Sequence, residues 1–407
     1  MNCRHCLSND LQDFLDLGYA PPSNAYLLAS QLLMPERHYP LRLFVCRECW
    51  LVQTRDYTNA EDLFGADYAY FSSTSSGWLK HAADYVTYMT KRLGLGSQSF
   101  VVEVAANDGY LLRNFRQTGI PCLGIEPTAS TAAAAEQLGI PVLREFFGEK
   151  LGLRLAETGR QADLIIGNNV YAHVPDINDF TRGLKQALKP NGTITIEFPH
   201  VLQLMKQIQF DTVYHEHFSY LSLYTVKCIF EKFGLKVIDV ETLATHGGSL
   251  RVYGSHEQDL RQTSSEVDRI MLQEHRFGLR NLVTYSTFQA KADRIKDDLL
   301  LFLIEAKRAG KCVAAYGAAA KGNTLLNYGG VKPDLLRFVC DAAVAKQGKY
   351  MPGSHLPIYP PSTMVESRPD YVLILPWNIA EEVMNQLSFI RQWGGKFVRA
   401  VPQLSVQ

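Results

Sequence analysis

The sequence predicts an α/β protein of three parts: a small N-terminal module with paired cysteines, a central Rossmann-like domain that ends in an antiparallel hairpin, and a C-terminal Rossmann-like domain. Three observations predict this architecture. Two C-x-x-C pairs lie within the first 49 residues, strands and helices alternate from about residue 99, and a second strand, glycine-containing turn and helix begin at residue 311. Such alternation is typical of parallel sheets covered by helices. The expected boundaries are residues 1–66, 67–257 and 258–407.

The composition fits a globular protein without a dominant charge. The chain has 407 residues, 46% of them hydrophobic, and its 41 basic residues balance 41 acidic ones. A chain of this length is expected to form about two to three domains. Zero net charge gives no electrostatic reason to expect nucleic acid or an anionic membrane as a partner. No apolar run approaches the roughly 20 residues that span a bilayer, and no signal-peptide pattern follows Met1, so a cytoplasmic protein is expected.

Four of the eight cysteines are paired by their spacing. Cys3 and Cys6 form one C-x-x-C pair, Cys46 and Cys49 form another, and the remaining four stand singly. A two-residue gap lets both thiolates of a pair point at one ion, and two pairs supply the four ligands of a closed, structural Zn²⁺ site. A redox pair of the thioredoxin type would need a strand-to-helix context that the first pair lacks. The 39 residues between the pairs exceed the usual spacing of a zinc ribbon, and His5 is expected to be a bystander.

The central region alternates strands and helices as a doubly wound parallel sheet requires. Strands are expected at residues 99–105, 122–125, 163–167 and 193–198, with helical stretches between them. A helix at 224–233 is followed by two strand-like runs, 235–241 and 249–253. These two runs lie too close together for a helical crossover, so they should pair as an antiparallel hairpin.

The loop after the first of these strands indicates which cofactor the sheet would hold. Dinucleotide-binding sheets use G-x-G-x-x-G so that a pyrophosphate can approach backbone N–H groups, whereas residues 105–109 retain only Gly109. A pyrophosphate is therefore disfavoured, and S-adenosylmethionine, which has none, tolerates the sparse loop. Glu126 ends the second strand, where an acidic residue grips a cofactor ribose; its alternative is to cap the helix after Pro127.

The C-terminal region follows a polar, helix-rich connector at about 258–308. Residues 311–316 predict a strand that turns into a helix, with later strands near 336–340 and 371–375. The glycine spacing matches the first part of a phosphate-binding loop, but Asn323 stands where the phosphate-binding lysine would be, which disfavours nucleotide hydrolysis. Backbone amides together with Lys321 could hold a diphosphate. Alternatively, the turn closes strand on helix and binds nothing.

The most conspicuous polar segment is Tyr-His-Glu-His-Phe-Ser-Tyr at residues 214–220. Polar side chains must be hydrogen-bonded if they are buried, so their density indicates a lined pocket. Zinc ligation, a general-base cluster and a polar surface loop are the three interpretations. The metalloprotease pattern H-E-x-x-H fails because Ser219 stands where the second histidine would be. Catalysis and a coincidental polar loop both stay open on these residues alone.

Seven motifs, in order, resemble those of the three-domain sugar C-methyltransferases that act on nucleotide-linked ketosugars. They are the cysteine pairs at 3–6 and 46–49, D-Y-A-Y-F-S-S at 67–73, E-V-A-A-N-D-G at 103–109, N-V-Y-A-H-V at 169–174, Y-H-E-H-F-S-Y at 214–220, G-G-S-L-R at 247–251 and Y-G-A-A-A-K-G-N at 316–323. The resemblance covers essentially the whole chain. Each motif alone is weak, but together they are highly specific.

The resemblance implies methyl transfer from S-adenosylmethionine to a carbon, most often C3, of a thymidine- or guanosine-diphosphate-linked 4-keto-6-deoxy sugar, in deoxysugar biosynthesis. A proton beside the C4 ketone must be removed, and the charge that builds on the ketone oxygen must be stabilised. The resemblance implies that the last histidine of the Y-H-E-H motif, which is His217 in this chain, acts as the base. Tyr214 and His173 are then expected around the ketone oxygen and Glu216 on the sugar, while His215 receives no role.

The remaining expected site residues divide between cofactor and substrate. The cofactor is expected to contact Glu103, Ala105, Asn107, Gly109, Glu126, Pro127, Asn168 and Asn169, and the nucleotide sugar Tyr68, Tyr70, Ser72, Tyr220, Gly248, Arg251, Lys321 and Asn323. Several of them have structural alternatives. Tyr68 and Tyr70 could be core aromatics, His173 a hydrogen-bonded structural histidine, and Gly248 with Arg251 part of the hairpin turn.

Other functions stay open beside C3 methylation. They are C5 methylation of a related ketosugar, a nicotinamide-dependent nucleotide-sugar oxidoreductase, and a non-catalytic zinc-binding module with a degenerate enzyme domain. Thermal stabilisation by NAD(P)H rather than by S-adenosylmethionine would favour the oxidoreductase, and no stabilisation by S-adenosylmethionine would favour the non-catalytic module. No coiled coil or exposed apolar helix demands a partner chain, so a monomer is expected.

Overall fold

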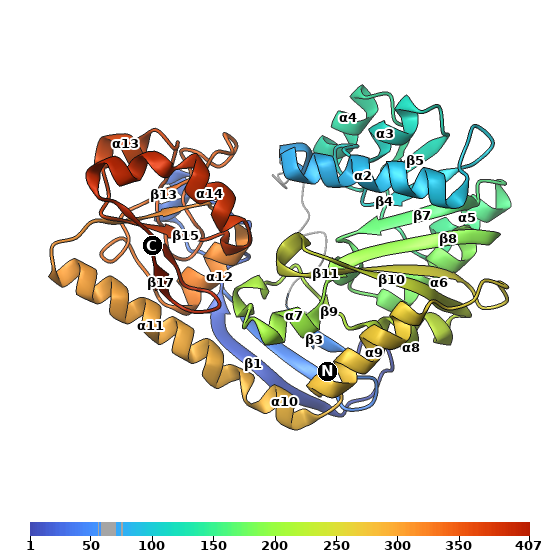
Figure 1. The fold of residues 1–407 in the computed structure, drawn as a ribbon, viewed down its shortest axis with the longest axis horizontal. Helices are drawn as coiled ribbons and strands as arrows, with labels where there is room; N and C mark the ends of the chain where they lie inside the picture. The colour runs from blue at the N-terminus through green and yellow to red at the C-terminus, as the bar shows by residue number, and fades with distance from the viewer. Residues whose placement is uncertain (56, 58–70, 75) are drawn as a thin grey trace.

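The computed structural model describes residues 1–55, 57, 71–74 and 76–407, and within them the strands form three sheets (Figure 1). Tyr68 and Tyr70, two of the expected substrate contacts, lie outside the described residues. The α/β fold class with an N-terminal cysteine module is confirmed.

The N-terminal sheet is antiparallel and brings the cysteine pairs together. It consists of β1 (Leu11–Ala20), β2 (Tyr39–Cys46), β3 (Val52–Thr54) and β9 (Ser219–Tyr220), in the order β1-β2-β3-β9. The register pairs Leu11 with Cys46, so the hairpin returns the second cysteine pair to the first. The long gap between the pairs is therefore this hairpin, with η1 (Ala29–Leu33) in its connection. The fourth strand, β9, belongs to the polar segment 214–220.

The central sheet has seven strands in the order β10-β11-β8-β7-β4-β5-β6. The strands are β4 (Val101–Val104), β5 (Cys122–Ile125), β6 (Val142–Leu143), β7 (Ala162–Asn168), β8 (Leu188–Pro199), β10 (Leu235–Leu243) and β11 (Ser249–His256). The strands from β6 to β8 are parallel, and β11 runs antiparallel between β8 and β10. The expected strands and terminal hairpin are confirmed; β6, at two residues, is too short to show a periodic pattern.

Helices cover both faces of the central sheet. α2 (Ser76–Leu93) and α3 (Leu112–Gln117) contribute buried side chains to the core on one face. The core on the other face includes residues of α5 (Glu149–Glu157), α6 (Ile177–Ala187), α8 (Leu223–Lys232) and α9 (Ser265–Phe277). α4 (Ala129–Gln137) lies beside α3 in Figure 1. These helices leave the carboxyl ends of the parallel strands uncovered, and the loops that follow the strands lie there, as in other open α/β sheets.

The C-terminal sheet has the order β14-β13-β12-β15-β16-β17 and is parallel except for β17. Its strands are β12 (Val313–Tyr316), β13 (Val339–Cys340), β14 (Ile358–Tyr359), β15 (Tyr371–Ile374), β16 (Lys396–Arg399) and β17 (Ser405–Val406). The helices of this region are α10 (Leu282–Ser286), α11 (Phe288–Arg308), α12 (Ala320–Tyr328), α13 (Thr363–Ser367), α14 (Ala380–Gln386), η6 (Trp377–Ile379) and η7 (Ser388–Trp393). The expected strand, glycine turn and helix are confirmed as β12, Gly317 and α12.

One hydrophobic core joins the N-terminal sheet to the C-terminal unit. Phe14 on β1 contacts the rings of Tyr285 and Phe288, each at a centroid distance of 5.1 Å, and β1 lies along α10 and α11 (Figure 1). The same core contains α7 (Val201–Lys206) and Phe210 of η4 (Phe210–Thr212). The chain that leads into segment 214–220 is thus fixed by packing from two other parts of the molecule.

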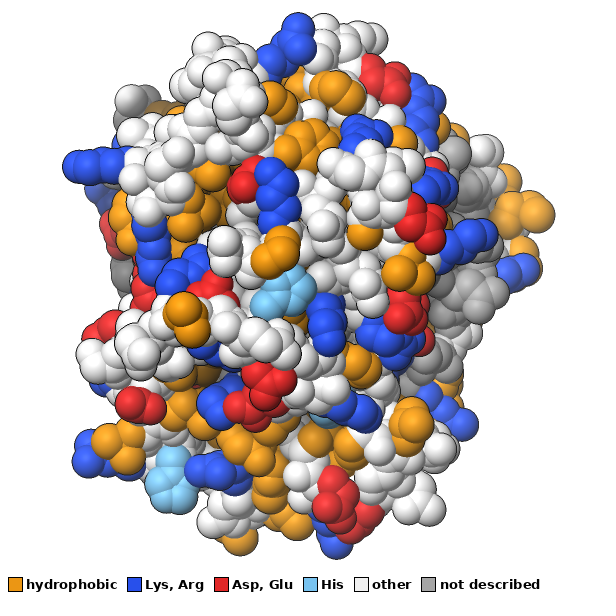
Figure 2. All heavy atoms as spheres, turned by 90° about the vertical axis from the view of Figure 1, so that its right-hand side faces the viewer, with side chains coloured by type: hydrophobic (Ala, Val, Ile, Leu, Met, Phe, Trp, Pro, Cys, Tyr) orange, Lys and Arg blue, Asp and Glu red, His pale blue; other side chains and the backbone are white. Residues whose placement is uncertain are grey.

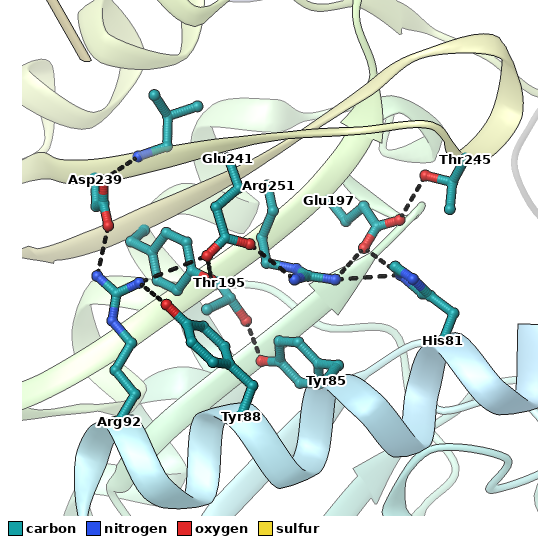
Figure 3. A network of polar contacts seen from close by, with 12 residues as sticks. His81, Tyr85, Tyr88, Arg92, Thr195, Glu197, Asp239, Glu241, Thr245 and Arg251 are labelled. Atoms are coloured by element: carbon teal, nitrogen blue, oxygen red, sulfur yellow. Dashed lines mark hydrogen bonds and ion pairs between the residues drawn. The ribbon is translucent and has the colours of Figure 1, made fainter. Parts of the chain in front are cut away.

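A buried ionic network ties α2 to the central sheet (Figure 3). Arg251 on β11, only 4% exposed, pairs with Glu197 on β8 at 3.0 Å and with Glu241 on β10 at 3.1 Å. His81 on α2 contacts the same Glu197 oxygen at 2.9 Å. Burial opposes ionisation of Glu197, but its hydrogen bond with His81 and the charges of His81 and Arg251 outweigh burial and lower its pKa. Arg251, an expected substrate contact, is therefore engaged with two carboxylates inside the fold.

The described part of the chain contains no helix that combines the length and the apolar character needed to cross a membrane. Figure 2 shows one face of the molecule, on which basic and acidic side chains are interspersed.

Replacing Arg251 with Met should destabilise the fold by about 3 to 5 kcal/mol, because it removes the guanidinium that pairs with the buried carboxylate of Glu197. Arg144 offers a matched control, since it pairs with Glu136 on the surface with both side chains at least 40% exposed. Arg144→Met should leave the denaturation midpoint nearly unchanged. Urea denaturation of both variants measures the difference, and equal midpoints would contradict the structural role of Arg251.

Candidate active site

Segment 214–220 is buried where the N-terminal sheet meets the central one. The backbone N–H of Phe218 donates to the carbonyl of Ala172 at 2.8 Å, and the N–H of Thr54 donates to the carbonyl of Phe218 at 3.1 Å. The side chains of His215, Glu216 and His217 are each 7% exposed or less. This burial excludes a polar surface loop, one of the three interpretations of the sequence.

Four of the expected site residues come together as a ring cluster, made of His217, Tyr214, His173 and Tyr220. The His217 ring lies 4.0 Å from that of Tyr214, 4.5 Å from that of His173 and 5.7 Å from that of Tyr220, measured between centroids. His173 comes from η3 (Tyr171–His173), just after β7. The Tyr220 hydroxyl accepts a hydrogen bond from the backbone N–H of Tyr214 at 3.3 Å. Two distant motifs therefore build one site.

The ring cluster favours uncharged imidazoles. Burial, and then the charges of His173 and His246, hold the pKa of His217 well below its usual range. Burial likewise lowers the pKa of His173 to about 4. A neutral imidazole has a free lone pair and can accept a proton. At neutral pH the cluster is thus in the protonation state that a general base requires.

His215 and Glu216, the two residues before His217, contact the N-terminal module instead. Asn24 donates through Nδ2 to both carboxylate oxygens of Glu216, at 3.0 and 2.9 Å. Burial raises the pKa of Glu216 to about 7. His215 contacts the carbonyl of Tyr39 through Nε2 at 3.3 Å. Glu216 is therefore bonded to Asn24 rather than to the rings, and His215 is structural.

The C-terminal unit brings a cation toward the ring cluster. Lys321 is the second residue of α12, and its Nζ lies 4.5 Å from the centre of the Trp377 ring and 2.5 Å from Oδ1 of Asn378. Its charge is one of the factors that lower the pKa of His217. Burial lowers the pKa of Lys321 to about 8, against the opposing effect of Asp211. Trp377 donates through Nε1 to Oδ2 of Asp211 at 2.6 Å, which links the two units beside the site.

Two other expected substrate contacts support the fold directly. Asn323 is fully buried, and its Nδ2 donates to the carbonyl of Ser23 at 2.7 Å. Gly248 turns the β10–β11 hairpin with φ 116°, and a Cβ there would lie 2.6 Å from Cγ of Gln203. The structure thus places Gly248 and Arg251 in the terminal hairpin, as their structural alternative had it, and Asn323 against the N-terminal module.

The carboxyl ends of β4 and β7 carry polar groups that require partners. Glu103 is 1% exposed, and neither of its carboxylate oxygens has a hydrogen-bond partner among the described residues. Burial, followed by the charges of Asp108 and Glu126, raises its pKa well above the usual value. Both amide atoms of Asn168 also lack a partner within the described chain. A ligand with cationic and hydrogen-bonding groups would satisfy these atoms, which fits the ammonium and sulfonium groups of S-adenosylmethionine.

The loop between β4 and α3 is held by Glu126 and shaped by left-handed residues. Glu126 accepts hydrogen bonds from the backbone N–H of Asn107 at 2.9 Å and, across Pro127, from that of Thr128 at 2.9 Å. Ala105, Asn107 and Gly109 have φ values of 57°, 50° and 78°, and a Cβ on Gly109 would lie 2.5 Å from Cδ1 of Ile140. The loop also contacts Ser72, whose N–H donates to Oδ1 of Asn107 at 2.9 Å. Glu126 thus anchors the loop and the start of α4 together.

The four paired cysteines form a compact sulfur cluster. Their Sγ atoms all lie within 4.8 Å of one another, with Cys3 and Cys49 at 3.4 Å and Cys6 and Cys46 at 3.5 Å. The hydrogen bond with Cys49 lowers the pKa of Cys3 to about 5, so a thiolate forms readily there. His5 bonds Asn178 through Nδ1 at 2.9 Å, as expected of a bystander. Four sulfurs at these separations fit one tetrahedral Zn²⁺, a closed site with no open position.

Sequence reasoning missed four residues around the ring cluster: Asn24, Asp211, His246 and Trp377. Asn24 and Trp377 come from distant parts of the chain and carry no local pattern. His246 directly precedes the G-G-S-L-R motif, so extending that motif by one residue could have found it. Its Nε2 lies 3.2 Å from Nδ2 of Asn169.

The sheet order, with an antiparallel strand inserted beside the last parallel one, and the polar groups at the carboxyl ends define a Rossmann-like methyltransferase. Family models agree part by part: a zinc binding domain matches residues 3–64, a methyltransferase domain matches 78–240 and a C-methyltransferase C-terminal domain matches 244–402.

The chain belongs to the C-methyltransferase family. It is 33% identical over 401 residues to C-methyltransferase NovU of Streptomyces niveus, covering 98% of this chain and 95% of that protein. The protein is therefore an S-adenosylmethionine-dependent C-methyltransferase with a structural zinc module.

Solved methyltransferases resemble it only weakly. Magnesium protoporphyrin IX methyltransferase from Synechocystis is 14% identical, with a TM-score of 0.34 over 44% of this chain and 80% of that one. An S-adenosylmethionine-dependent methyltransferase from Clostridium acetobutylicum is 11% identical, with a TM-score of 0.36 over 44% and 92% of the two chains. Scores this low add no argument to the sheet order and the family match.

Replacing Cys46 with Ser should release zinc and lower the melting temperature, because a structural zinc site contributes directly to folding. Cys228 is a half-buried cysteine outside the cluster and serves as the control. Metal analysis of purified protein should show zinc in wild type and in Cys228→Ser but not in Cys46→Ser. Full zinc occupancy in Cys46→Ser would contradict the four-sulfur site.

Glu216 predicts a defined pH dependence of stability. Its folded-state pKa of about 7 lies above the ordinary value of 4.5, so its contribution to stability is fully present below pH 4.5 and is lost as the pH rises through 7. Glu216→Gln stays neutral throughout. From pH 5 to pH 8 the stability of this variant should improve relative to wild type by roughly 2 to 3 kcal/mol, measured by urea unfolding at each pH. Parallel pH profiles for the two proteins would contradict the raised pKa.

Proposed function

We propose that this C-methyltransferase methylates C3 of a nucleoside-diphosphate-linked 4-keto-6-deoxy sugar in deoxysugar biosynthesis. The observation that carries the proposal is the ring cluster: His217 is buried and neutral, and it lies against Tyr214 and His173. A carbon beside a ketone becomes a nucleophile when a base removes its proton and a polar group stabilises the resulting oxyanion. The cluster contains both kinds of group.

In the proposed reaction, His217 takes the C3 proton and the electrons of the C–H bond move into an enolate. The Tyr214 hydroxyl donates a hydrogen bond to the oxygen on which the charge builds and keeps its hydrogen, with His173 beside it. S-adenosylmethionine supplies the methyl group that the enolate carbon takes from the sulfonium sulfur, which restores the ketone and leaves S-adenosylhomocysteine. His217 then returns its proton to solvent.

Because the pKa of His217 is lowered, proton removal by His217 must be assisted by other groups that stabilise the enolate. An imidazole with an ordinary pKa of about 6.5 is already a weak base for a carbon acid, and burial weakens it further. Stabilisation of the enolate must therefore supply much of the rate, and one good oxyanion donor contributes roughly 3 kcal/mol. Tyr214 is the donor closest to His217 in the cluster, and the cation of Lys321 adds a favourable field.

The other proposed contacts follow the polar groups at the strand ends. Glu103, Ala105, Asn107, Gly109, Glu126, Pro127, Asn168 and Asn169 would hold the cofactor, and Tyr68, Tyr70, Ser72, Tyr220 and Lys321 the nucleotide sugar. Gly248, Arg251 and Asn323 would act indirectly, through the contacts that they make inside the fold. Glu216 would orient the sugar indirectly, through the backbone of segment 214–220, to which His217 also belongs.

We further propose three domains, at residues 1–66, 67–257 and 258–407, of which the last contributes to nucleotide-sugar binding. The carrier is thymidine or guanosine diphosphate, and the protein acts as a cytoplasmic monomer. Lys321, whose charge acts on His217 from the C-terminal unit, supports a role of that unit in binding the diphosphate.

Incubation with S-adenosylmethionine and a panel of thymidine- and guanosine-diphosphate 4-keto-6-deoxy sugars tests the proposal. Mass spectrometry should show the gain of one CH₂ unit in the sugar, and NMR should place it at C3. Methylation at C5, or no methylation of any ketosugar, would contradict the proposed substrate.

His217→Gln should lower kcat by about 100-fold to 10,000-fold, because the general base is lost, while binding of S-adenosylmethionine is retained. His215→Gln is the matched control: it changes an equally buried histidine two residues away that contacts the carbonyl of Tyr39, and it should keep activity near that of wild type. Steady-state kinetics and calorimetric cofactor binding measure both effects. Wild-type turnover by His217→Gln would remove His217 from the mechanism.

Tyr214→Phe should lower kcat by roughly 100-fold with little change in KM, since the hydroxyl acts on the oxyanion that forms in the transition state. The backbone N–H of Tyr214 still donates to Tyr220 in this variant, so the fold of the segment is kept. An unchanged kcat would make Tyr214 a packing residue.

A further inference from the structure

Asn169 and His246 are two non-glycine residues in the left-handed region whose side chains meet. Their φ values are 53° and 54°, and Nδ2 of Asn169 lies 3.2 Å from Nε2 of His246. Asn169 follows β7, and His246 lies in η5 (Thr245–Gly247), within the turn between β10 and β11. Non-glycine residues adopt the left-handed conformation uncommonly, although Asn and His do so more often than most, and here the fold holds both residues in it. Conformations of this kind are concentrated at functional sites.

Glu197 anchors the backbone around both residues. Its carbonyl accepts from the N–H of Asn169 at 2.7 Å, and its carboxylate accepts from the hydroxyl of Thr245 at 3.0 Å. The carboxylate is itself fixed by His81 and Arg251, as Figure 3 shows. One buried residue therefore sets the relative position of the two loops that carry Asn169 and His246.

The turn that carries His246 is also closed on its other side. A Cβ on Gly247 would lie 2.5 Å from the Trp377 ring and 2.7 Å from Nε2 of Gln209, so the glycine fits closely against the C-terminal unit. The His246 ring packs edge-on against Trp78 of α2 at a centroid distance of 5.3 Å. His246 thus has little freedom to turn away from Asn169.

The hydrogen bond with His246 fixes which way the Asn169 amide points. Burial, and then the charge of Lys321, lowers the pKa of His246 to about 4, so its ring is neutral near pH 7. A neutral ring carries one hydrogen, and because the amide nitrogen of Asn169 can only donate, Nε2 is the ring nitrogen that accepts. The amide oxygen, Oδ1, is then directed elsewhere; it is buried and has no hydrogen-bond partner among the described residues. An acceptor in that situation requires a donor from a ligand.

We propose that His246 is a positioning residue, which accepts a hydrogen bond from the Asn169 amide so that Asn169 Oδ1 receives one from an ammonium or hydroxyl group of the methyl donor. The proposal rests on the proposed cofactor role of Asn169. The location supports it: β7 lies beside β4, which carries Glu103, and neither carboxylate oxygen of Glu103 has a hydrogen-bond partner among the described residues. In open α/β sheets a ligand lies across such neighbouring strand ends.

Calorimetric binding of S-adenosylhomocysteine to the full zinc-loaded chain tests the proposal without any sugar. His246→Phe keeps a ring against Trp78 but removes the acceptor, and it should weaken binding by about tenfold, as expected for one lost hydrogen bond. His246→Gln can accept the same amide hydrogen through its side-chain oxygen, and it should bind within about threefold of wild type. Asn169→Ala should weaken binding as much as His246→Phe does.

The double variant Asn169→Ala/His246→Phe separates positioning from direct contact. If His246 acts through Asn169, the double variant binds no more weakly than Asn169→Ala alone, because the two effects share one path. Three results would each overturn the proposal: losses of affinity that multiply in the double variant, wild-type affinity in His246→Phe, or equal losses of affinity in His246→Phe and His246→Gln. Thermal melting and zinc content show whether each variant is folded. If His246→Phe does not fold, the comparison of His246→Gln with Asn169→Ala decides. A loss of affinity in His246→Gln equal to that in Asn169→Ala would then overturn the proposal.

The outcome is independent of the proposed substrate. A wild-type protein that binds S-adenosylhomocysteine but methylates no nucleotide ketosugar would contradict the proposed function and leave the role of His246 intact. A wild-type protein that methylates the sugar, together with a His246→Phe variant that binds S-adenosylhomocysteine normally, would support the proposed function and contradict the role of His246.

Discussion

The structure depends on the burial of the polar segment 214–220 between the N-terminal sheet, the central sheet and the C-terminal unit. Burial removes water from these side chains, so each must find a partner or lose its charge. The fold meets this constraint from three sides. β9 pairs with β3, Asn24 binds Glu216, and α12 holds the chain before the segment through the hydroxyl of Thr324, which donates to the carbonyl of Val213 at 2.8 Å. Segment 214–220 is therefore part of what joins the three parts of the molecule.

The same burial sets the chemistry that the site can perform. The imidazoles of His217 and His173 are neutral because water is excluded and because the nearby ring of His246 opposes a positive charge on either of them. Glu216, the nearest carboxylate in sequence, is directed to Asn24 and does not raise the basicity of His217. A weak, neutral base next to a phenol suits a reaction in which the enolate is stabilised as it forms. Stability and mechanism thus derive from one desolvated cluster.

Local patterns in the sequence predicted much of the fold, but they could not predict the pairing of strands and side chains that are far apart in the sequence. The strand at residues 122–125 and the hairpin of β10 and β11 could be predicted because alternation and short connections are local signals. The pairing of β9 with the N-terminal sheet could not, because a two-residue strand has no period and its partner lies far away in the sequence. For the same reason Arg251 was expected at the substrate, whereas Glu197 and Glu241, its partners from neighbouring strands, could not be identified. Motif membership located the ring cluster but not the Asn24 and Trp377 contacts that surround it.

In the proposed mechanism His217 is a neutral buried base that removes a proton from the carbon beside a ketone. Solvent exchange isolates this step. The protein is incubated in D₂O with S-adenosylhomocysteine, which cannot donate a methyl group, and a nucleoside-diphosphate 4-keto-6-deoxy sugar, and deuterium at C3 is followed by NMR. Wild type and His215→Gln should introduce deuterium at C3, and His217→Gln should not. Exchange at the wild-type rate in His217→Gln would show that another group removes the proton.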